Sequence, residues 1–344
     1  MSARHAALTR RRAVLSGLVG AVATACATRP PARAGGRPAE SSRPAPARAV
    51  PRALLEHLPA AGLRWLVTAR LRDLFRDRDL VDALAPLLPP ARLDDLAERT
   101  GIELRETPAA VVAGFDYGTL YAVEYAGATA EIERRFRATL LGPPRLIELS
   151  PTIRVQTGVA GAAVRSLVVV ERRVIGVAFD DPTPAKIVAA YATGRLRAPV
   201  ALRGAALSSL TPSLAEAPLA AFAAGPFDYL GTRGARGLIA EAFAFGLALT
   251  PRGERLELVA EIAGDFADGV GGAAARLGGV WGDLAESPTG RLLALQGAPA
   301  PPRTATAEDR ARLEVSLSLP AFTKGLVDAT VAEVWQVLGL PPPR

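Results

Sequence analysis

The chain has 344 residues, of which 49% are hydrophobic, so it is long enough for one large domain or two smaller ones. Its net charge of +7 suggests a nucleic-acid partner, but residues 1–59 hold the whole excess: the residues from 60 onward carry 31 bases against 32 acids. A DNA- or RNA-binding body needs a basic face of its own, so composition excludes that class of partner.

The scarcity of cysteine and histidine excludes several kinds of active site. Cys26 is the only cysteine, and His57 is the only histidine beyond the first few residues. A structural zinc site needs a closed set of cysteine and histidine ligands, and a serine triad needs a well-placed histidine. No stretch has the spacing of an EF-hand calcium loop. We therefore expect no metal and no cofactor.

Residues 1–25 have the organisation of an export signal. Four arginines precede residue 13, and no acidic residue occurs before Glu40. The apolar segment 13–25 follows and ends at Cys26. A membrane-spanning helix takes roughly 20 apolar residues, so this segment is too short to span, and we expect it to be cleaved.

Two parts of this signal resemble known signals. Arg11 and Arg12, followed by apolar residues, resemble the twin-arginine export signal. Residues 23–26 resemble the lipobox of bacterial lipoproteins, which implies cleavage before Cys26 and acylation of that cysteine. Because Ala27 follows instead of aspartate, the resemblance implies an anchor in the outer membrane, facing the periplasm. An ordinary cleaved signal peptide is the alternative.

Residues 26–59 are predicted to form a disordered tether. They are rich in proline, alanine and arginine and show no apolar periodicity, so they cannot bury enough surface to offset the entropy of ordering. Their six arginines favour anionic lipid heads. Order is expected to begin near Leu63, and the tether would lift the folded body off the membrane.

The residues from 60 to 200 show alternating strand patterns and amphipathic helix patterns. Gly101 is expected to end the third element, a helix, as its C-cap. The predicted elements are a strand at 63–70, helices at 79–88 and 90–100, strands at 109–114 and 119–125, a helix at 129–141, strands at 152–158, 164–170 and 173–179, and a helix at about 184–192.

The residues from 201 to 344 contain the clearest hairpin in the chain, 243–249 with 256–262, joined by a turn at 251–253. The other predicted elements are a helix at 217–223, a helix at 272–286, a strand at 291–296, a loop at 297–306, a strand at 311–318 and a helix at 320–338.

Hairpins followed by helices predict an α+β fold, with mostly antiparallel sheets and packed helices. A weak internal repeat relates residues 122–127 to residues 259–264 at an offset of 137 residues. The repeat predicts two related tandem units, 60–200 and 201–344.

Two stretches are candidate binding sites. Gly231, Gly234 and Gly237, spaced three residues apart among arginines before a short helix, could hold an anion on backbone N–H groups. Their spacing matches no known phosphate-binding motif, so a flexible connection before the helix is the favoured interpretation. The apolar side of the clear hairpin could line a lipid or ligand groove, and its candidate residues are Phe243, Phe245 and Leu247.

Three hypotheses for function follow. The first is a non-enzymatic, membrane-anchored envelope lipoprotein that binds a partner protein or envelope component. The second is a periplasmic carrier of lipid or another small ligand. The third is a hydrolase that uses carboxylates, with Glu124, Glu257 and Glu261 as candidates, although the spacing of Glu257 and Glu261 along one strand, roughly 13 Å, is too long for a retaining pair.

Overall fold

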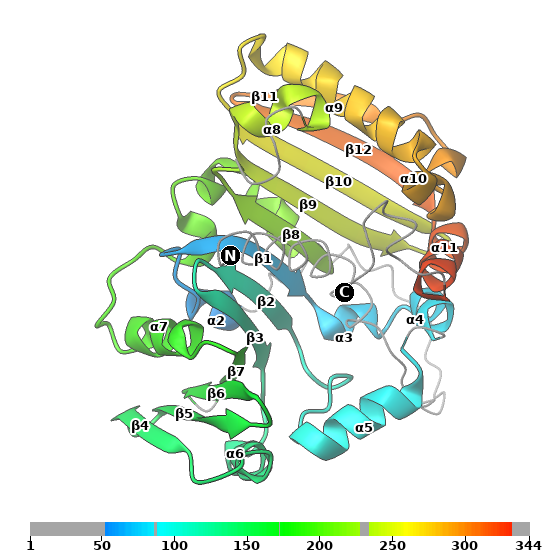
Figure 1. The fold of residues 1–344 in the computed structure, drawn as a ribbon. Helices are drawn as coiled ribbons and strands as arrows, with labels where there is room; N and C mark the ends of the chain where they lie inside the picture. The colour runs from blue at the N-terminus through cyan, green and yellow to red at the C-terminus, as the bar shows by residue number, and fades with distance from the viewer. Residues whose placement is uncertain (1–51, 86–87, 172, 228–233, 332–344) are drawn as a thin grey trace, which may run out of the picture.

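The computed structural model describes residues 52–85, 88–171, 173–227 and 234–331. These residues form one twelve-stranded sheet with helices on both faces (Figure 1). Neighbouring strands are antiparallel throughout, in the order β11-β12-β10-β9-β8-β1-β2-β3-β7-β6-β5-β4.

The strands are β1 Leu63–Ala69, β2 Ala110–Phe115, β3 Gly118–Glu124, β4 Arg145–Ser150, β5 Ile153–Ala160, β6 Ala163–Val170, β7 Val174–Phe179, β8 Leu219–Ala224, β9 Ala242–Arg252, β10 Arg255–Gly264, β11 Arg303–Ala307 and β12 Arg310–Ser318. The helices are α2 Arg52–Glu56, α3 Leu71–Leu74, α4 Arg78–Leu84, α5 Pro90–Thr100, α6 Thr129–Ala138, α7 Thr183–Ala192, α8 Leu238–Glu241, α9 Gly269–Glu286, α10 Pro288–Leu292 and α11 Leu319–Val331.

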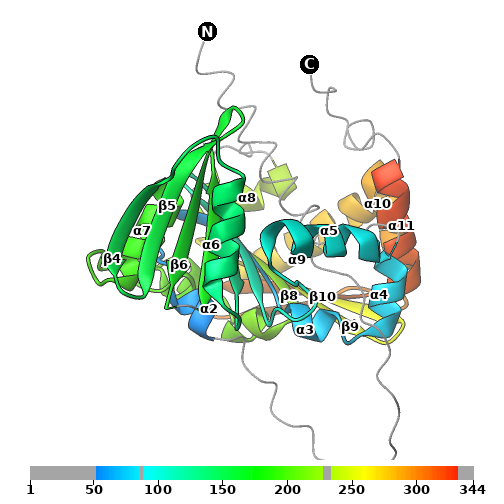
Figure 2. The ribbon, with the colours of Figure 1, turned by 90° about the horizontal axis from the view of Figure 1, so that it is seen from below.

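The two faces of the sheet are covered by different helices, because successive side chains of a strand point to opposite sides. On the face that we call the front, Ile262 and Leu313 pack in one core cluster with Trp281 of α9. On the back face, Leu66 packs in a second cluster with Val188 of α7, together with α2 and the 3₁₀ turns before β8. Figure 2 shows α6, α5 and α4 in succession along the front face.

The two halves of the sheet have the same strand order. The first half reads β1-β2-β3-β7-β6 and the second reads β8-β9-β10-β12-β11, and β1 pairs with β8 where the halves meet. A helix follows the third strand in each half, α6 in one and α9 in the other. The pair Val111 and Ala122 corresponds to the pair Ala248 and Val259, each shifted by 137 residues. The hairpin β4–β5 has no counterpart among the described residues of the second half. The sheet is continuous across residue 200.

Most of the predicted elements are confirmed. The two hairpins, β2–β3 and β9–β10, occur where the alternation placed them, and helices occur close to 90–100, 129–141 and 272–286. Gly101 caps α5 in the left-handed conformation, with its N–H donating to the carbonyl of Ala97. The fold is thus a large antiparallel sheet with packed helices, as the pattern predicts.

The predicted helix at 217–223 is wrong, because these residues form β8. Alanine is the best helix former, and this segment is rich in it. Its backbone, however, pairs with β1 on one side and β9 on the other, at the centre of the sheet. Ala220 and Phe222 are buried on the back face. Pairing on both edges and burial override local propensity here.

Four further differences from prediction concern single elements. The predicted strand at 291–296 is wrong: α10 covers its start, because the Ser287 hydroxyl accepts a hydrogen bond from Gly290 N–H and Pro288 follows as the first helical residue. The predicted loop at 297–306 contains β11, an exposed edge strand without apolar alternation. Order also begins before Leu63, since α2 and the turn after it bury Leu54 and Leu58 completely. β4 was not predicted.

Candidate functional site

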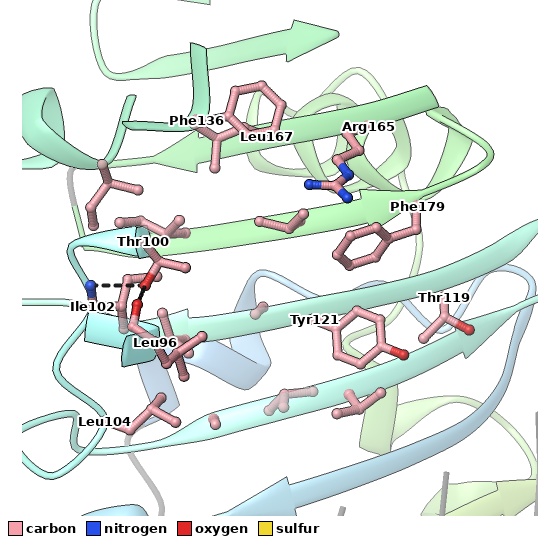
Figure 3. A pocket seen from close by; sticks show the side chains of 18 of the residues that line it. Leu96, Thr100, Ile102, Leu104, Thr119, Tyr121, Phe136, Arg165, Leu167 and Phe179 are labelled. Atoms are coloured by element: carbon pink, nitrogen blue, oxygen red, sulfur yellow. Dashed lines mark hydrogen bonds between the residues drawn. The ribbon is translucent and has the colours of Figure 1, made fainter. Parts of the chain in front are cut away.

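A cavity of about 720 Å³ lies on the front face of the first half of the sheet. Its floor consists of β1, β2, β3, β7 and β6, and α5 and α6 form its walls (Figure 3). Most lining side chains are aliphatic or aromatic, and they come from stretches of chain as far apart as Trp65 and Phe179. We call this space the front cavity.

The floor has an orderly arrangement, because the strand registers place its side chains in rows across the sheet. The row nearest α5 is aliphatic, the middle row is mostly aliphatic, and the far row is aromatic and polar. These rows are Ala69, Ala110, Val123 and Ile175; then Val67, Val112, Tyr121, Val177 and Leu167; then Trp65, Gly114, Thr119, Phe179 and Arg165.

Trp65 requires a glycine beside it in the far row. A Cβ atom on Gly114 would lie 2.1 Å from the indole Nε1 of Trp65, so any larger residue at 114 would displace the ring. The close approach of the indole to the β2 backbone fixes the ring across the floor at this end of the cavity.

The wall formed by α6 is attached to the sheet in two ways. Ile132 packs in a small apolar cluster with Leu167 and Ile175 beneath it. On the side away from the cavity, the buried carboxylate of Glu133 accepts hydrogen bonds from Arg154 and Gln156 of β5. A buried carboxylate is stable only when it is paired, so this network holds α6 over the outer strands.

The wall formed by α5 is joined to α6 by Arg135. This side chain donates to the carbonyl of Ala97 at the end of α5 and also to the carboxylate of Glu131 on α6. Hydrogen bonds from Arg134 and Arg135 lower the pKa of Glu131 to about 2, so that this carboxylate is ionised at neutral pH. Leu96 of α5 closes the aliphatic end of the cavity, together with Ile102 and Leu104 of the following loop.

The opposite end of the cavity is open to solvent. Tyr121 is 49% exposed and Phe179 is 41% exposed. Their rings meet edge to face, with centroids 5.6 Å apart. The guanidinium of Arg165 lies over the Phe179 ring, 5.5 Å from its centroid. Aromatic groups and one cation therefore surround the opening.

Several predicted site residues lie outside the described part of the chain. Cys26, Arg11, Arg12 and Gly231 belong to this group. Gly234 and Gly237 begin and end a 3₁₀ turn before α8, which has only four residues.

The arginine in that turn already has an anionic partner. Arg236 makes two hydrogen bonds to the carboxylate of Asp283 on α9, and these bonds lower the pKa of Asp283. The turn thus connects to α9, and an anion site on its glycines remains a prediction.

The residues predicted for an apolar groove lie on β9, in the second half of the sheet. Phe245 and Leu247 are half-buried and pack against the front core cluster, and Phe243 lies at the start of the strand with 36% exposure. None of the three lines the front cavity. A groove at these residues remains a prediction, and the apolar cavity is in the other half.

The predicted carboxylates lie on the back face or at the surface. Glu124 and Glu261 are buried, and each has an arginine partner: Arg173 at 3.4 Å and Arg312 at 2.8 Å, respectively. The exposed Glu257 is 3.4 Å from the Nε of an arginine in β9. None of the three lines the front cavity.

The described residues contain neither a metal-binding cluster nor a membrane-spanning helix. They contain no group of three or more histidine, cysteine, aspartate or glutamate side chains arranged to hold a metal ion. No helix in this part of the chain has both the length and the apolar character to cross a bilayer.

Comparison with known proteins leaves the function open. No family model matches the chain, and no curated protein matches it. Among solved structures, crystal forms III, I and IV of TP0453 are similar, with TM-scores of 0.42, 0.43 and 0.43 and identities of 12%, 9% and 10%. The matches cover 80%, 80% and 81% of this chain and 98%, 96% and 96% of the other.

Proposed function

We propose that the protein is a cell-envelope binding protein that carries an elongated apolar ligand in the front cavity. The supporting observation is the cavity itself, about 720 Å³ lined mainly by aliphatic and aromatic side chains. Ligand sites have volumes of roughly 300–1,000 Å³, predominantly apolar walls and a few polar groups. Ordinary protein cores are packed as densely as organic crystals, so a space of this size points to a ligand.

Titration with the neutral fluorophore N-phenylnaphthylamine tests this function. Val112 lies in the middle row of the floor, so Val112→Trp fills the centre of the cavity. We expect this variant to bind the fluorophore at least tenfold more weakly. Val159→Trp is the matched control, because Val159 is exposed and does not line the cavity. Equal binding by both variants would exclude the cavity as the site. Native mass spectrometry of gently purified protein would identify a ligand that copurifies.

The carrier is proposed to be attached to a membrane at its N-terminus. Arg11 and Arg12 would direct export, and acylated Cys26 would anchor the protein in the outer membrane, facing the periplasm. Cys26→Ser should move the protein from the membrane fraction to the soluble periplasmic fraction. Replacement of both arginines by lysine should leave the precursor in the cytoplasm. If the Cys26→Ser protein stays in the membrane fraction, the lipid anchor is excluded, and the proposals for export and for ligand binding are unaffected.

The two halves of the body are proposed to be related tandem units. The matching strand order and the shared 137-residue offset of the two hairpins support this proposal. Homologous sequences aligned against themselves should show the same offset through β2–β3 and β9–β10. Offsets that scatter among homologues would count against a duplication.

A second candidate function is binding of a partner protein at the outer edge of the first half. The edge strand β4 exposes Leu146, which is 50% accessible, and Leu141 beside β5 is 75% accessible. An exposed edge strand can pair with a strand of another protein. Leu146→Lys should abolish cross-linking to an envelope partner, and Leu284→Lys, on the exposed side of α9, should leave it intact.

A further inference from the structure

The front cavity is amphipathic along its length. The rows of the floor run from Ala69, beside α5, to Arg165, at the open end. Residues in the first and third rows of one strand are four positions apart, so these rows are separated by roughly 13 Å. The aliphatic end is closed by α5, and the aromatic and polar end faces solvent. This arrangement suits a ligand with an apolar tail and one polar head.

Arg165 gives the polar end its charge. Within the residues that the structure describes, no carboxylate forms an ion pair with Arg165, and its buried Nε has no hydrogen-bond partner. The other arginine of the lining, Arg99, lies on α5 and pairs with Asp95. The Nε of Arg165 is inaccessible, so a ligand oxygen would bind at the terminal N–H groups of the Arg165 guanidinium, for which the described residues supply no hydrogen-bond partner.

Contacts around Arg165 orient its guanidinium without neutralising it. The group lies over the ring of Phe179, which Tyr121 contacts edge to face. Stacking leaves the N–H edge of a guanidinium free to donate two parallel hydrogen bonds, a geometry that matches carboxylate and phosphate. The Thr119 hydroxyl belongs to the same row of the floor, opposite Gly114, and adds a neutral polar group.

We propose that the ligand is a single-chain anionic amphiphile whose carboxylate or phosphate head binds Arg165, while its hydrocarbon tail extends across the floor toward α5. This inference rests on the proposed function of the cavity and specifies the ligand class. Carboxylate and phosphate heads share the required chemistry, and the experiment distinguishes between them.

Four amphiphiles with the same tail test the head group: dodecanoate, dodecyl phosphate, dodecanol and dodecyltrimethylammonium. Each would displace N-phenylnaphthylamine from the full-length protein below its micelle concentration. We expect one or both anions to bind at least tenfold more tightly than dodecanol, and the cation to bind most weakly. The anion that binds more tightly identifies the source of the head group.

Variants at the two lining arginines assign the head to one end of the cavity. Arg165→Gln should lower the affinity for the anions to that for dodecanol, and should leave the affinity for dodecanol unchanged. Arg165→Lys should restore part of the preference, since lysine keeps the charge but loses the paired geometry. Arg99→Gln should leave the preference intact. If Arg99→Gln removes the preference for anions over dodecanol and Arg165→Gln keeps it, the proposed orientation is overturned.

The outcomes separate this inference from the function on which it rests. If dodecanol displaces the fluorophore as well as the anions do, the head-group inference fails and the apolar carrier function stands. If none of the four compounds displaces the fluorophore, or the fluorophore does not bind, the carrier function fails. Thermal unfolding of each variant shows whether a lost affinity reflects lost folding.

Discussion

The front face of the sheet is closed in the second half and hollow in the first, although the two halves share one strand order. In the second half, the eighteen residues of α9 lie along β11 and β12 and bury Leu277 and Trp281 (Figure 1). In the first half, the ten residues of α6 lie over the outer strands and bury only Ile132 among their large apolar side chains. The same strand order therefore supports a closed core in one half and a cavity in the other, depending on the helix that covers it.

Two floor residues of β2 differ in the same sense. Ala110 and Val112 of β2 occupy the register positions that Leu247 and Leu249 occupy in β9. At these two positions the hollow half has the smaller side chain and the closed half has leucine. The short, charged helix α6 and these two small side chains of β2 together leave space in the first half unfilled.

The largest expected effect comes from truncating one tryptophan in each half. Trp281→Ala opens a new cavity under α9 and should lower the free energy of unfolding by about 3–5 kcal/mol. Trp65→Ala should cost less than half as much, because it enlarges a space that already exists. Urea denaturation measures both. Equal losses would contradict the contrast between a closed and a hollow half.

The next effect concerns the attachment of α6. Glu133→Ala leaves the buried groups of Arg154 and Gln156 without their acceptor, and should lower the free energy of unfolding by roughly 1–3 kcal/mol. Fluorophore affinity should also fall, because the wall is loosened. Glu131→Ala, on the same helix but in exposed ion pairs, is the control and should change stability far less. The reverse order would show that the network does not hold the wall.

A smaller effect is expected from making the hollow half resemble the closed one. Ala110→Leu places in the cavity floor the residue that β9 has at the matching position. Stability should change by less than about 1 kcal/mol, because open space receives the side chain without strain. Fluorophore affinity should fall several-fold. A large destabilisation would mean that the floor is already tightly packed.

The smallest effect concerns pH and the back face. Burial lowers the pKa of His57 below 6.5, and the attraction of Glu171, 3.9 Å away, only partly offsets this. The folded state then binds fewer protons than the unfolded state, so stability should decline as pH falls below about 6.5. His57→Gln should flatten this part of the profile. Fluorophore affinity should stay constant, since the described residues that line the cavity include neither histidine nor an acid.

Much of the fold could be predicted from local pattern. Period-two alternation located β9 and β10, and Gly101 marked the end of α5. Two of the failures share one cause: the alanines of β8 favour a helix, and the edge strand β11 has no apolar alternation, so only pairing with neighbouring strands makes them strands.

The location of the candidate site could not be predicted in the same way. The sequence predicted a groove at Phe245 and Leu247, because they belong to the most apolar strand face. In the structure, these side chains pack against the core beside α9. The site instead combines Trp65, Val112 and Arg165 from three separated segments. The sequence did contain a weak signal. Trp65, Arg165 and Phe179 lie near the ends of their strands, and the other front-face residues of these strands are aliphatic.

By itself, the sequence determined the neutral charge of the body, the scarcity of histidine and cysteine, and most strands, since these depend on composition and on near neighbours. It also supplied every residue of the proposed export signal and anchor. Only the tertiary structure decided which face of which half stays uncovered. Alternation of apolar residues shows which side chains share a face of the sheet. Whether a helix covers that face depends on where α6 and α9 lie. Contacts between residues distant in the chain set the positions of these helices, as Glu133 with Gln156 does for α6.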